Sequence, residues 1–232
     1  MAILGQHKSN INQSDDSIDY EVGVHRDALF LIIAGHKRLT ENAADYSNEE
    51  EPNITGELVR STREYIEAPD ACEWASGYAV HDDPPENDAI RMGKRRKKVD
   101  IIVERTQKGR HPRMRFEAKR LKRPGFPASE YVGGKGLGEF IAGNYAAGDD
   151  TAGMLGYVQS DDCDYWARKI SDDLRKKKKE VGIVKGGQWQ KAHLDNIDQC
   201  YQTLHNRPTI KRELLVYHLL LVFVRRHEQT TN

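Results

Sequence analysis

The sequence predicts an α/β domain in which a mixed central β-sheet is flanked by helices. Two segments with helical periodicity open the chain, and a pair of strand-like segments joined by a turn-rich connector follows. Helices then alternate with strands to the end of the chain. A chain of 232 residues can form one sizeable core, and no internal repeat divides it. We therefore expect a frayed or disordered segment over residues 1–18 and a single domain over residues 19–232.

The first third of the chain predicts two helices and one strand. Apolar residues recur with helical spacing over residues 22–39. The acidic stretch over residues 42–53 lacks this periodicity and is interpreted as a loop. Thr55 is a suitable N-cap for a second helix that continues to about Glu67. Residues 74–80 alternate well enough to predict a strand.

The middle of the chain carries the clearest local signal, which predicts a β-hairpin. After a loop over residues 81–93, the segments 98–106 and 113–121 both have strand-like patterns. The connector between them, residues 107–112, is rich in turn-forming residues. The two strands are therefore expected to pair antiparallel. A loop containing Gly and Pro continues to about Gly136.

The C-terminal half predicts two helices and three strands. In order, the pattern gives a short helix over 137–145, a strand over 154–159, a helix over 163–181, and strands over 199–204 and 213–224. The longer helix carries its aromatic and aliphatic residues on one face. Its last turns are basic, which complements the negative end of the helix dipole.

Composition excludes several classes of protein. Hydrophobic residues make up 38% of the chain and charged residues 31%, which is too apolar for a fully disordered chain. No run approaches the roughly 18 apolar residues of a membrane span, and no secretion signal opens the chain. Cys72, Cys163 and Cys200 stand far apart, which argues against a zinc site and a disulfide framework. We therefore expect a cytoplasmic protein that does not associate with membranes.

The formal net charge of zero conceals a strong segregation of charge. Residues 1–90 contain 19 acidic and 6 basic residues, whereas residues 91–123 contain 15 basic residues and only the acids Asp100, Glu104 and Glu117. A basic block of this density predicts a polyanionic partner such as a nucleic acid. The alternative is a solvated charged face without a partner.

Three charged residues of the predicted hairpin are candidates for a catalytic centre. Residues two apart on a strand share a face, so Glu117 and Lys119 point the same way. In the simplest register of the hairpin Asp100 would lie opposite Ala118 and face the wrong side. An offset of one residue, or a bulge, would put Asp100 beside Glu117 or Lys119. The hypothesis therefore requires that offset.

This combination of groups suits the hydrolysis of a phosphodiester bond. Mg²⁺ is held by a few carboxylates together with waters and phosphate oxygens, and a nearby cation stabilises the charge of the transition state. Asp100, Glu117 and Lys119 would supply these parts. The alternative for Glu117 and Lys119 is an exposed cross-strand ion pair, worth only about 0.2–1 kcal/mol.

The segments Val99-Asp100-Ile101-Ile102 and Arg115-Phe116-Glu117-Ala118-Lys119-Arg120-Leu121 resemble the PD-(D/E)xK, or restriction-endonuclease-like, superfamily of nucleases. Val99 stands where the family name has proline. The resemblance implies a restriction-endonuclease-like core and a Mg²⁺ cofactor, for which Mn²⁺ can substitute. It implies that Asp100, Glu117 and the carbonyl of Ala118 bind the metal. Lys119 would position the water and stabilise the charge on the phosphate.

The resemblance also implies a further acid from the helix before the first strand of the motif. Glu57 is the candidate for this additional metal ligand, and Glu64 is the second choice. Thr203-x-His205-x-Arg207, together with His218, resembles a pattern found in a bacterial branch of this superfamily, and so does Lys94-x-Arg96. A buried or merely exposed histidine remains the alternative for each histidine.

Seven basic residues are expected to contact the nucleic acid: Lys94, Arg96, Lys98, Arg120, Lys135, His205 and Arg207. In a strand, His205 and Arg207 would share a face, and an outward-facing pair suits phosphate contact. Lys135 lies in the glycine-rich segment over residues 133–138. This segment lacks the Gly-Lys-Ser/Thr ending of a phosphate-binding loop, and we expect it to be flexible.

The sequence thus predicts a Mg²⁺-dependent endonuclease that acts on nucleic acid, with DNA favoured. The resemblance implies a homo-oligomer or a partner protein, in a bacterial anti-phage defence or restriction system. Two other functions stay open. One is a nucleic-acid-binding module without catalysis, and the other is a structural or regulatory subunit whose basic block docks an acidic protein.

Overall fold

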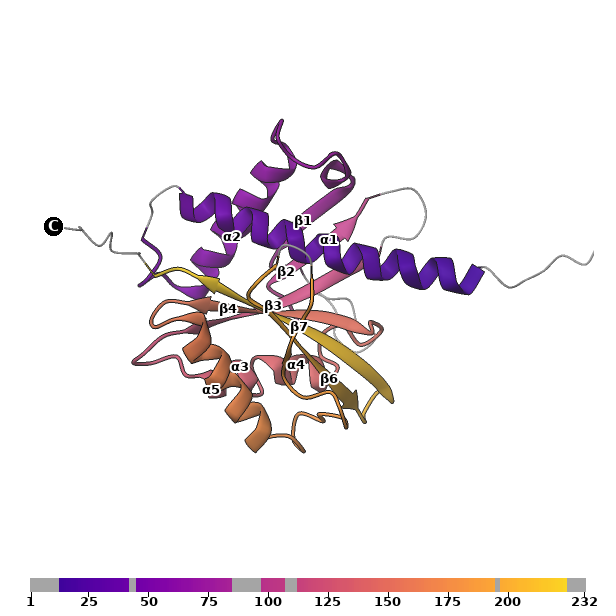
Figure 1. Cartoon of the computed structure of the whole chain (residues 1–232), viewed down its shortest axis with the longest axis vertical. Helices are drawn as coiled ribbons and strands as arrows, with labels where there is room; N and C mark the ends of the chain where they lie inside the picture. Colours follow the sequence, from indigo (N-terminus) through magenta and orange to yellow (C-terminus); the bar gives the residue numbers. More distant parts are fainter. Residues whose placement is uncertain (1–12, 42–44, 85–96, 107–111, 195–196, 225–232) are drawn as a thin grey trace, which may run out of the picture.

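The computed structural model describes residues 13–41, 45–84, 97–106, 112–194 and 197–224. A seven-stranded mixed sheet lies at the centre, and helices cover both of its faces (Figure 1). The predicted α/β class with a flanked mixed sheet is confirmed at this level. No helix in the described ranges is long and apolar enough to cross a membrane.

The sheet has the strand order β1-β2-β3-β4-β7-β6-β5. Its strands are β1 (Tyr78–Asp82), β2 (Ile101–Arg105), β3 (Arg113–Leu121), β4 (Thr151–Val158), β5 (Gln190–Lys191), β6 (Cys200–Arg207) and β7 (Arg212–Val222). β3 and β4 pair in parallel, as do β4 and β7, and all other neighbours are antiparallel. The expected β2–β3 hairpin pairing is therefore present, although most of its connector, residues 107–111, lies outside the described residues.

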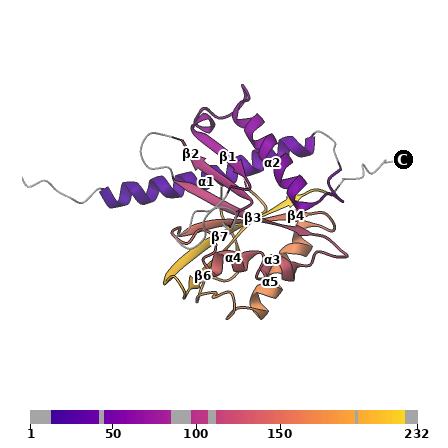
Figure 2. The same ribbon diagram turned by 180° about the vertical axis from the view of Figure 1, so that it is seen from behind.

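The helices form two layers, one on each side of the sheet (Figures 1 and 2). One layer consists of α1 (Gln13–Glu41) and α2 (Glu51–Ile66), and the other of α3 (Ala128–Val132), α4 (Leu137–Ile141) and α5 (Cys163–Lys176). Apolar residues of α1 and α2 pack with the sheet in one core cluster, and those of α3, α4 and α5 pack in a second. Each face of the sheet is therefore buried by its own helical layer.

The register of β2 and β3 has the one-residue offset that the catalytic hypothesis requires. Ile101 pairs with Phe116 and Ile102 with Arg115, so continuing this register puts Asp100 level with Glu117. Phe116 is fully buried in the α1–α2 core. Because side chains alternate along a strand, Glu117 faces the α3–α5 side. The requirement on the register is confirmed.

The start of α2 differs from the prediction. The helix begins at Glu51 with Pro52 in its first turn, a position where proline fits because its missing N–H has no helical partner. Thr55 is therefore not the N-cap. It is buried in the helix, and its Oγ1 lies 2.9 Å from the Tyr157 hydroxyl of β4. This contact ties α2 to the sheet.

Other boundaries shift in smaller ways. α1 already includes residues 13–18, so this part of the expected frayed segment is helical, and residues 1–12 lie outside the described residues. A 3-10 helix, Glu73–Gly77, occupies the beginning of the expected strand before β1. α3 and β5 were not predicted. Both are short, and short elements carry little periodic signal.

The contact between Thr55 and Tyr157 is expected to stabilise the docking of α2. Tyr157→Phe or Thr55→Val leaves a buried hydroxyl without its partner, which should lower the free energy of unfolding by about 1–2 kcal/mol. The double variant should lose less than the sum, because both partners are then apolar. Urea unfolding of the four proteins measures the coupling. Strictly additive losses would contradict the contact.

Candidate active site

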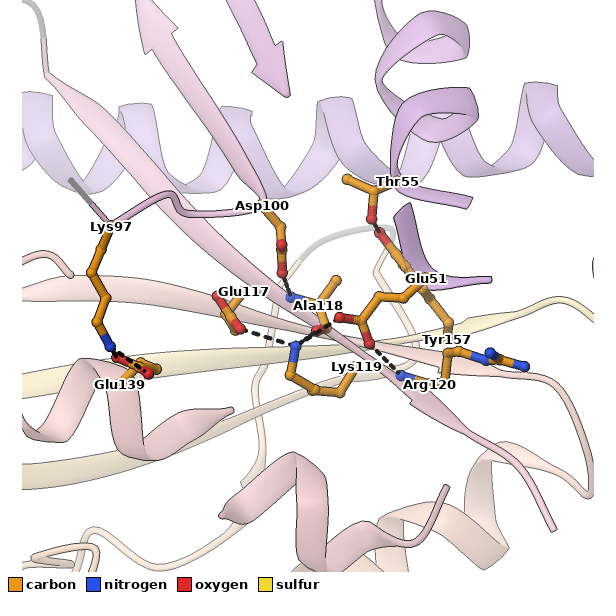
Figure 3. Close-up of polar contacts among 10 residues, drawn as sticks. All are labelled: Glu51, Thr55, Lys97, Asp100, Glu117, Ala118, Lys119, Arg120, Glu139 and Tyr157. Atoms are coloured by element: carbon orange, nitrogen blue, oxygen red, sulfur yellow. Dashed lines mark hydrogen bonds and ion pairs between the residues drawn. The ribbon is translucent and has the colours of Figure 1, made fainter. Parts of the chain in front are cut away.

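Asp100, Glu117 and Lys119 come together where β2 begins and β3 passes beneath it (Figure 3). Oδ2 of Asp100 accepts a hydrogen bond from the backbone N–H of Ala118 at 2.6 Å. Nζ of Lys119 lies 3.0 Å from Oε1 of Glu117. Only 6% of the Glu117 side chain is exposed. The structure therefore brings all three predicted catalytic residues into one buried cluster rather than an exposed cross-strand pair.

A third carboxylate, which the sequence did not predict, completes this cluster. Oε1 of Glu51, at the start of α2, lies 2.8 Å from Nζ of Lys119. The predicted candidates Glu57 and Glu64 are wrong, because both pair with Arg60 on the exposed side of the helix. The signal that identifies Glu51 is its place directly before Pro52, since proline marks the first turn of a helix.

The ammonium of Lys119 holds this cluster together. Besides Glu51 and Glu117, it donates to the carbonyl oxygen of Ala118 at 2.5 Å. Burial lowers the pKa of Lys119, but attraction to Glu117, Glu51 and Asp100 outweighs burial and leaves the pKa above its usual value. Lys119 is therefore charged, and it is the cation around which the oxygens gather.

The carboxylates outnumber this single cation. Burial raises the pKa of Glu117 to about 8, and repulsion from Asp100 acts in the same direction. Burial raises the pKa of Asp100 to about 6, although Lys119 and the N–H of Ala118 oppose the shift. Additional positive charge at this point would favour the ionised forms of both groups.

The donor set fits Mg²⁺ in its chemistry. Asp100, Glu117, Glu51 and the carbonyl of Ala118 are all oxygen donors of the kind that Mg²⁺ prefers. Oε2 of Glu117 is buried without a hydrogen-bond partner, so this oxygen is available to a ligand. No group of three or more His, Cys, Asp or Glu side chains in the described ranges is arranged to hold an ion. Lys119 occupies the space between the carboxylates instead.

An open cleft of about 770 Å³ adjoins the cluster. It is lined by Glu51, Lys119, Arg120, Phe126, Ser129, Glu130, Gly133, Gly134, Lys135, Glu139 and Tyr145. Lys135 is exposed, so a ligand in the cleft can reach this predicted nucleic-acid contact. At the far side, Nζ of Lys97 lies 2.7 and 2.6 Å from the two carboxylate oxygens of Glu139 (Figure 3).

The glycine-rich segment that carries Lys135 forms a tight turn, and its flexibility stays a prediction. The carbonyl of Gly133 accepts from the N–H groups of Gly136 and Gly138 at 3.1 and 2.9 Å. A Cβ at Gly136 would lie 2.3 Å from the carbonyl oxygen of Tyr131. Only glycine permits this close approach, which fixes Lys135 at the rim of the cleft.

Arg120 lines the cleft, but its guanidinium is engaged by protein. It donates to Oε2 of Glu50 at 2.6 Å and to Oε1 of Gln159 at 2.8 Å. The amide of Gln159 donates in turn to the carbonyls of Tyr46 and Glu49. Arg120 therefore anchors the segment before α2, and the prediction that it contacts nucleic acid is corrected.

His205 and Arg207 are both fully buried, so the prediction of an outward-facing pair is wrong. Arg207 donates to the carbonyls of Ala146, Asp149 and Glu213. Strand periodicity correctly placed both residues on one face. It does not reveal that the 145–150 segment and residues around Val181 cover that face.

His205 belongs to a buried chain of hydrogen bonds with a single direction. The carbonyl of Val181 can only accept, so Nδ1 of His205 donates to it at 2.7 Å. Nε2 of His205 then accepts from Thr203, which accepts from His218, whose Nδ1 accepts from Tyr131. Burial lowers the pKa of His205 to about 4. Both histidines are thus neutral core residues.

Of the remaining predicted contacts, Lys98 is about half exposed and pairs with Asp83. Lys94 and Arg96 lie outside the described residues.

No family model, no curated protein and no solved structure matches this chain. The chemistry that the site supports therefore follows from its own residues. Buried carboxylates, a carbonyl and a charged lysine at the wall of an open cleft suit the binding of a divalent cation and an anionic substrate.

The raised pKa of Glu117 predicts a pH-dependent effect of Glu117→Gln on stability. Between about pH 4.5 and 8 the folded wild type binds more protons than the unfolded chain, so its stability falls as pH rises. Gln removes this loss. The melting temperature of the variant should exceed that of the wild type by an amount that grows from pH 5 to pH 8.

Each pKa unit corresponds to about 1.36 kcal/mol, so the gain in the free energy of unfolding is a few kcal/mol at most. Thermal melts in metal-free buffer measure it. Glu57→Gln makes the same substitution at an exposed position and serves as the control. A gain for Glu117→Gln that does not change with pH would contradict the account of the buried charge.

Proposed function

We propose that this protein is a metal-dependent nuclease that hydrolyses phosphodiester bonds, with DNA as the favoured substrate. The observation that carries the proposal is the register of β2 and β3, which sets Asp100 level with Glu117 beside Lys119. The alternative explanation is an exposed ion pair, or a buried ion pair that has only a structural role. Such pairs do not need a buried excess of carboxylates next to an open cleft.

We further propose that the core is restriction-endonuclease-like. The antiparallel β2–β3 pair carries Asp100, Glu117 and Lys119, and β3 continues the sheet in parallel with β4. Helices cover both faces, and α2 brings Glu51 to the same point. Membership of a homo-oligomer or of a defence system stays a prediction from the resemblance.

In this proposal Asp100, Glu117 and the carbonyl of Ala118 hold the ion, and Glu51 replaces the predicted Glu57 as the additional acid. Mg²⁺ is the expected ion, and Mn²⁺ can substitute. When bound, the ion supplies Lewis-acid stabilisation of the charge that develops on the phosphate.

Lys119 has two positions in this account. Without an ion its ammonium bridges Glu51 and Glu117. A divalent ion held by the same oxygens would supply the charge that the ammonium supplies now, and Lys119 would then be free to turn toward the cleft. There Lys119 can hold the attacking water and stabilise the negative charge of the transition state. Glu51, whose side chain is 27% exposed, lies on the cleft side and orients Lys119.

A nucleic-acid-binding subunit without catalysis is the second candidate. It is favoured by the ion pairs of Lys119 with Glu51 and Glu117, which satisfy the lysine without a metal. This candidate predicts salt-sensitive binding that survives the loss of Asp100. It also predicts that no divalent ion binds at the cluster.

Cleavage assays separate the two candidates. The pure protein is incubated with plasmid DNA and with RNA in Mg²⁺ or Mn²⁺. Lys119→Met should lower the cleavage rate by about 10²–10³-fold, because it removes one stabilising charge of the transition state. Asp100→Asn and Glu117→Gln should lower it at least as much, and Glu51→Gln by about 10–100-fold. Glu57→Gln should leave the rate unchanged. If the wild type cleaves neither DNA nor RNA, the catalytic proposal fails.

Metal binding provides a separate prediction. Mn²⁺ should raise the melting temperature of the wild type, because it binds the folded cluster and not the unfolded chain. Asp100→Asn should abolish this shift. Lys119→Met should retain or enlarge it, since the competing ammonium is gone, although the variant is inactive. Loss of the Mn²⁺ shift in Lys119→Met would contradict the displacement of the lysine by the ion.

A further inference from the structure

A second, basic pocket lies next to the cleft. Its volume is about 320 Å³, and it is lined by Lys122, Arg123, Gly125, Pro127, Ala128, Tyr165, Trp166, Lys169, Asp173 and Lys176. The segment 125–130 separates the two pockets, with Phe126, Ser129 and Glu130 on the side of the cleft. We call the second pocket the basic groove. It is formed between this segment and α5.

The charges of the catalytic cleft are largely compensated within the protein. Lys119, Lys97 and Arg120 each pair with at least one carboxylate. Lys135 differs, because no carboxylate in the described ranges lies within ion-pair distance of it. The cleft therefore offers a bound polyanion few cations of its own.

The basic groove is different, because part of its charge is uncompensated. Arg123 pairs with Asp161, and Lys176 with Asp173. Nζ of Lys122, by contrast, donates at 2.6 Å to the side-chain oxygen of Asn48, which carries no charge. This leaves the positive charge of Lys122 available to a ligand.

Lys169 is the second uncompensated cation of the groove. Its ammonium lies 5.4 Å from the centre of the Tyr165 ring, and the guanidinium of Arg123 lies 4.6 Å from the same ring. Cation–π contacts of this kind hold a cation in place without neutralising it. Tyr165 thus keeps two cations at one side of the groove, and the described part of the chain provides Lys169 with no carboxylate partner.

We propose that the basic groove binds backbone phosphates of the nucleic-acid strand whose scissile phosphate lies in the catalytic cleft. The inference rests on the nuclease function proposed for the cleft. A phosphodiester strand suits both pockets, because it carries one negative charge per nucleotide and can continue across the segment 125–130. Binding of this kind depends on charge and not on base sequence. The groove would then supply the affinity that the compensated cleft lacks.

The test is binding of labelled oligonucleotides by Lys122→Glu/Lys169→Glu in an Asp100→Asn background, measured by fluorescence anisotropy over a range of NaCl concentrations. Two lost phosphate contacts should weaken binding about 10-fold or more at low salt. They should reduce the slope of log affinity against log salt by about 1.4 for single strands, or about 1.8 for duplex DNA.

The matched control is Lys37→Glu/Lys191→Glu, which changes the net charge equally at exposed residues of α1 and β5. Thermal melts check that both double variants fold. Oligonucleotides of about 2–4 and about 12–16 nucleotides are compared, since only the longer ones should reach from the cleft into the groove. The effect of the groove variant should therefore grow with length.

Three results would overturn the proposal. Equal losses of affinity in the groove variant and the control would show that overall charge, and not the groove, causes the loss. A loss of affinity that does not depend on oligonucleotide length would show that the groove does not bind the same strand as the cleft. Polyglutamate that binds as tightly as DNA of equal charge would identify an acidic protein as the partner.

Failure of the nuclease proposal alone would give a different result. The wild type would then cleave nothing, although groove-dependent binding persists. The opposite pattern, cleavage that the groove variant leaves intact together with unchanged binding, refutes the groove alone. A wild type that binds no nucleic acid refutes both.

Discussion

The ammonium of Lys119 lies between Glu51 of α2 and Glu117 of β3, and it also donates to the carbonyl of Ala118. Removing this cation would leave Glu51 and Glu117 facing each other in a largely buried position without the charge that pairs with both of them. This ion pair ties the start of α2 to the sheet, the Arg120–Gln159 contacts fix the residues before the helix, and apolar residues of α2 pack in the core. The wall of the cleft thus depends on one buried charge.

The cluster around Lys119 contains more acidic groups than this one cation can neutralise. One lysine faces three acids. Burial raises the pKa values of Asp100 and Glu117, and attraction to Lys119 offsets only part of this rise. A divalent ion would balance their charge and would use the unpartnered Oε2 of Glu117. Under the proposed function, the buried charge that destabilises the metal-free protein is the same charge that would favour binding of a metal.

The sequence predicted the parts of the site that follow from strand periodicity. It placed Glu117 and Lys119 on one face and set a condition on the register of Asp100, which the β2–β3 pairing meets. Glu51 was missed because an acidic stretch without periodicity was interpreted as a loop. The error at His205 has another cause. Periodicity shows which residues share a face, but whether that face is covered depends on segments distant in sequence.

The most direct test of the central claim is a crystal of the protein soaked in Mn²⁺, with an anomalous difference map calculated at the manganese edge. We expect one strong peak between Asp100 and Glu117, within coordination distance of the carbonyl of Ala118. We also expect that Nζ of Lys119 has moved away from Glu117 toward the cleft. No peak at this position, or a peak elsewhere with the ion pairs of Lys119 intact, would contradict the proposed metal site.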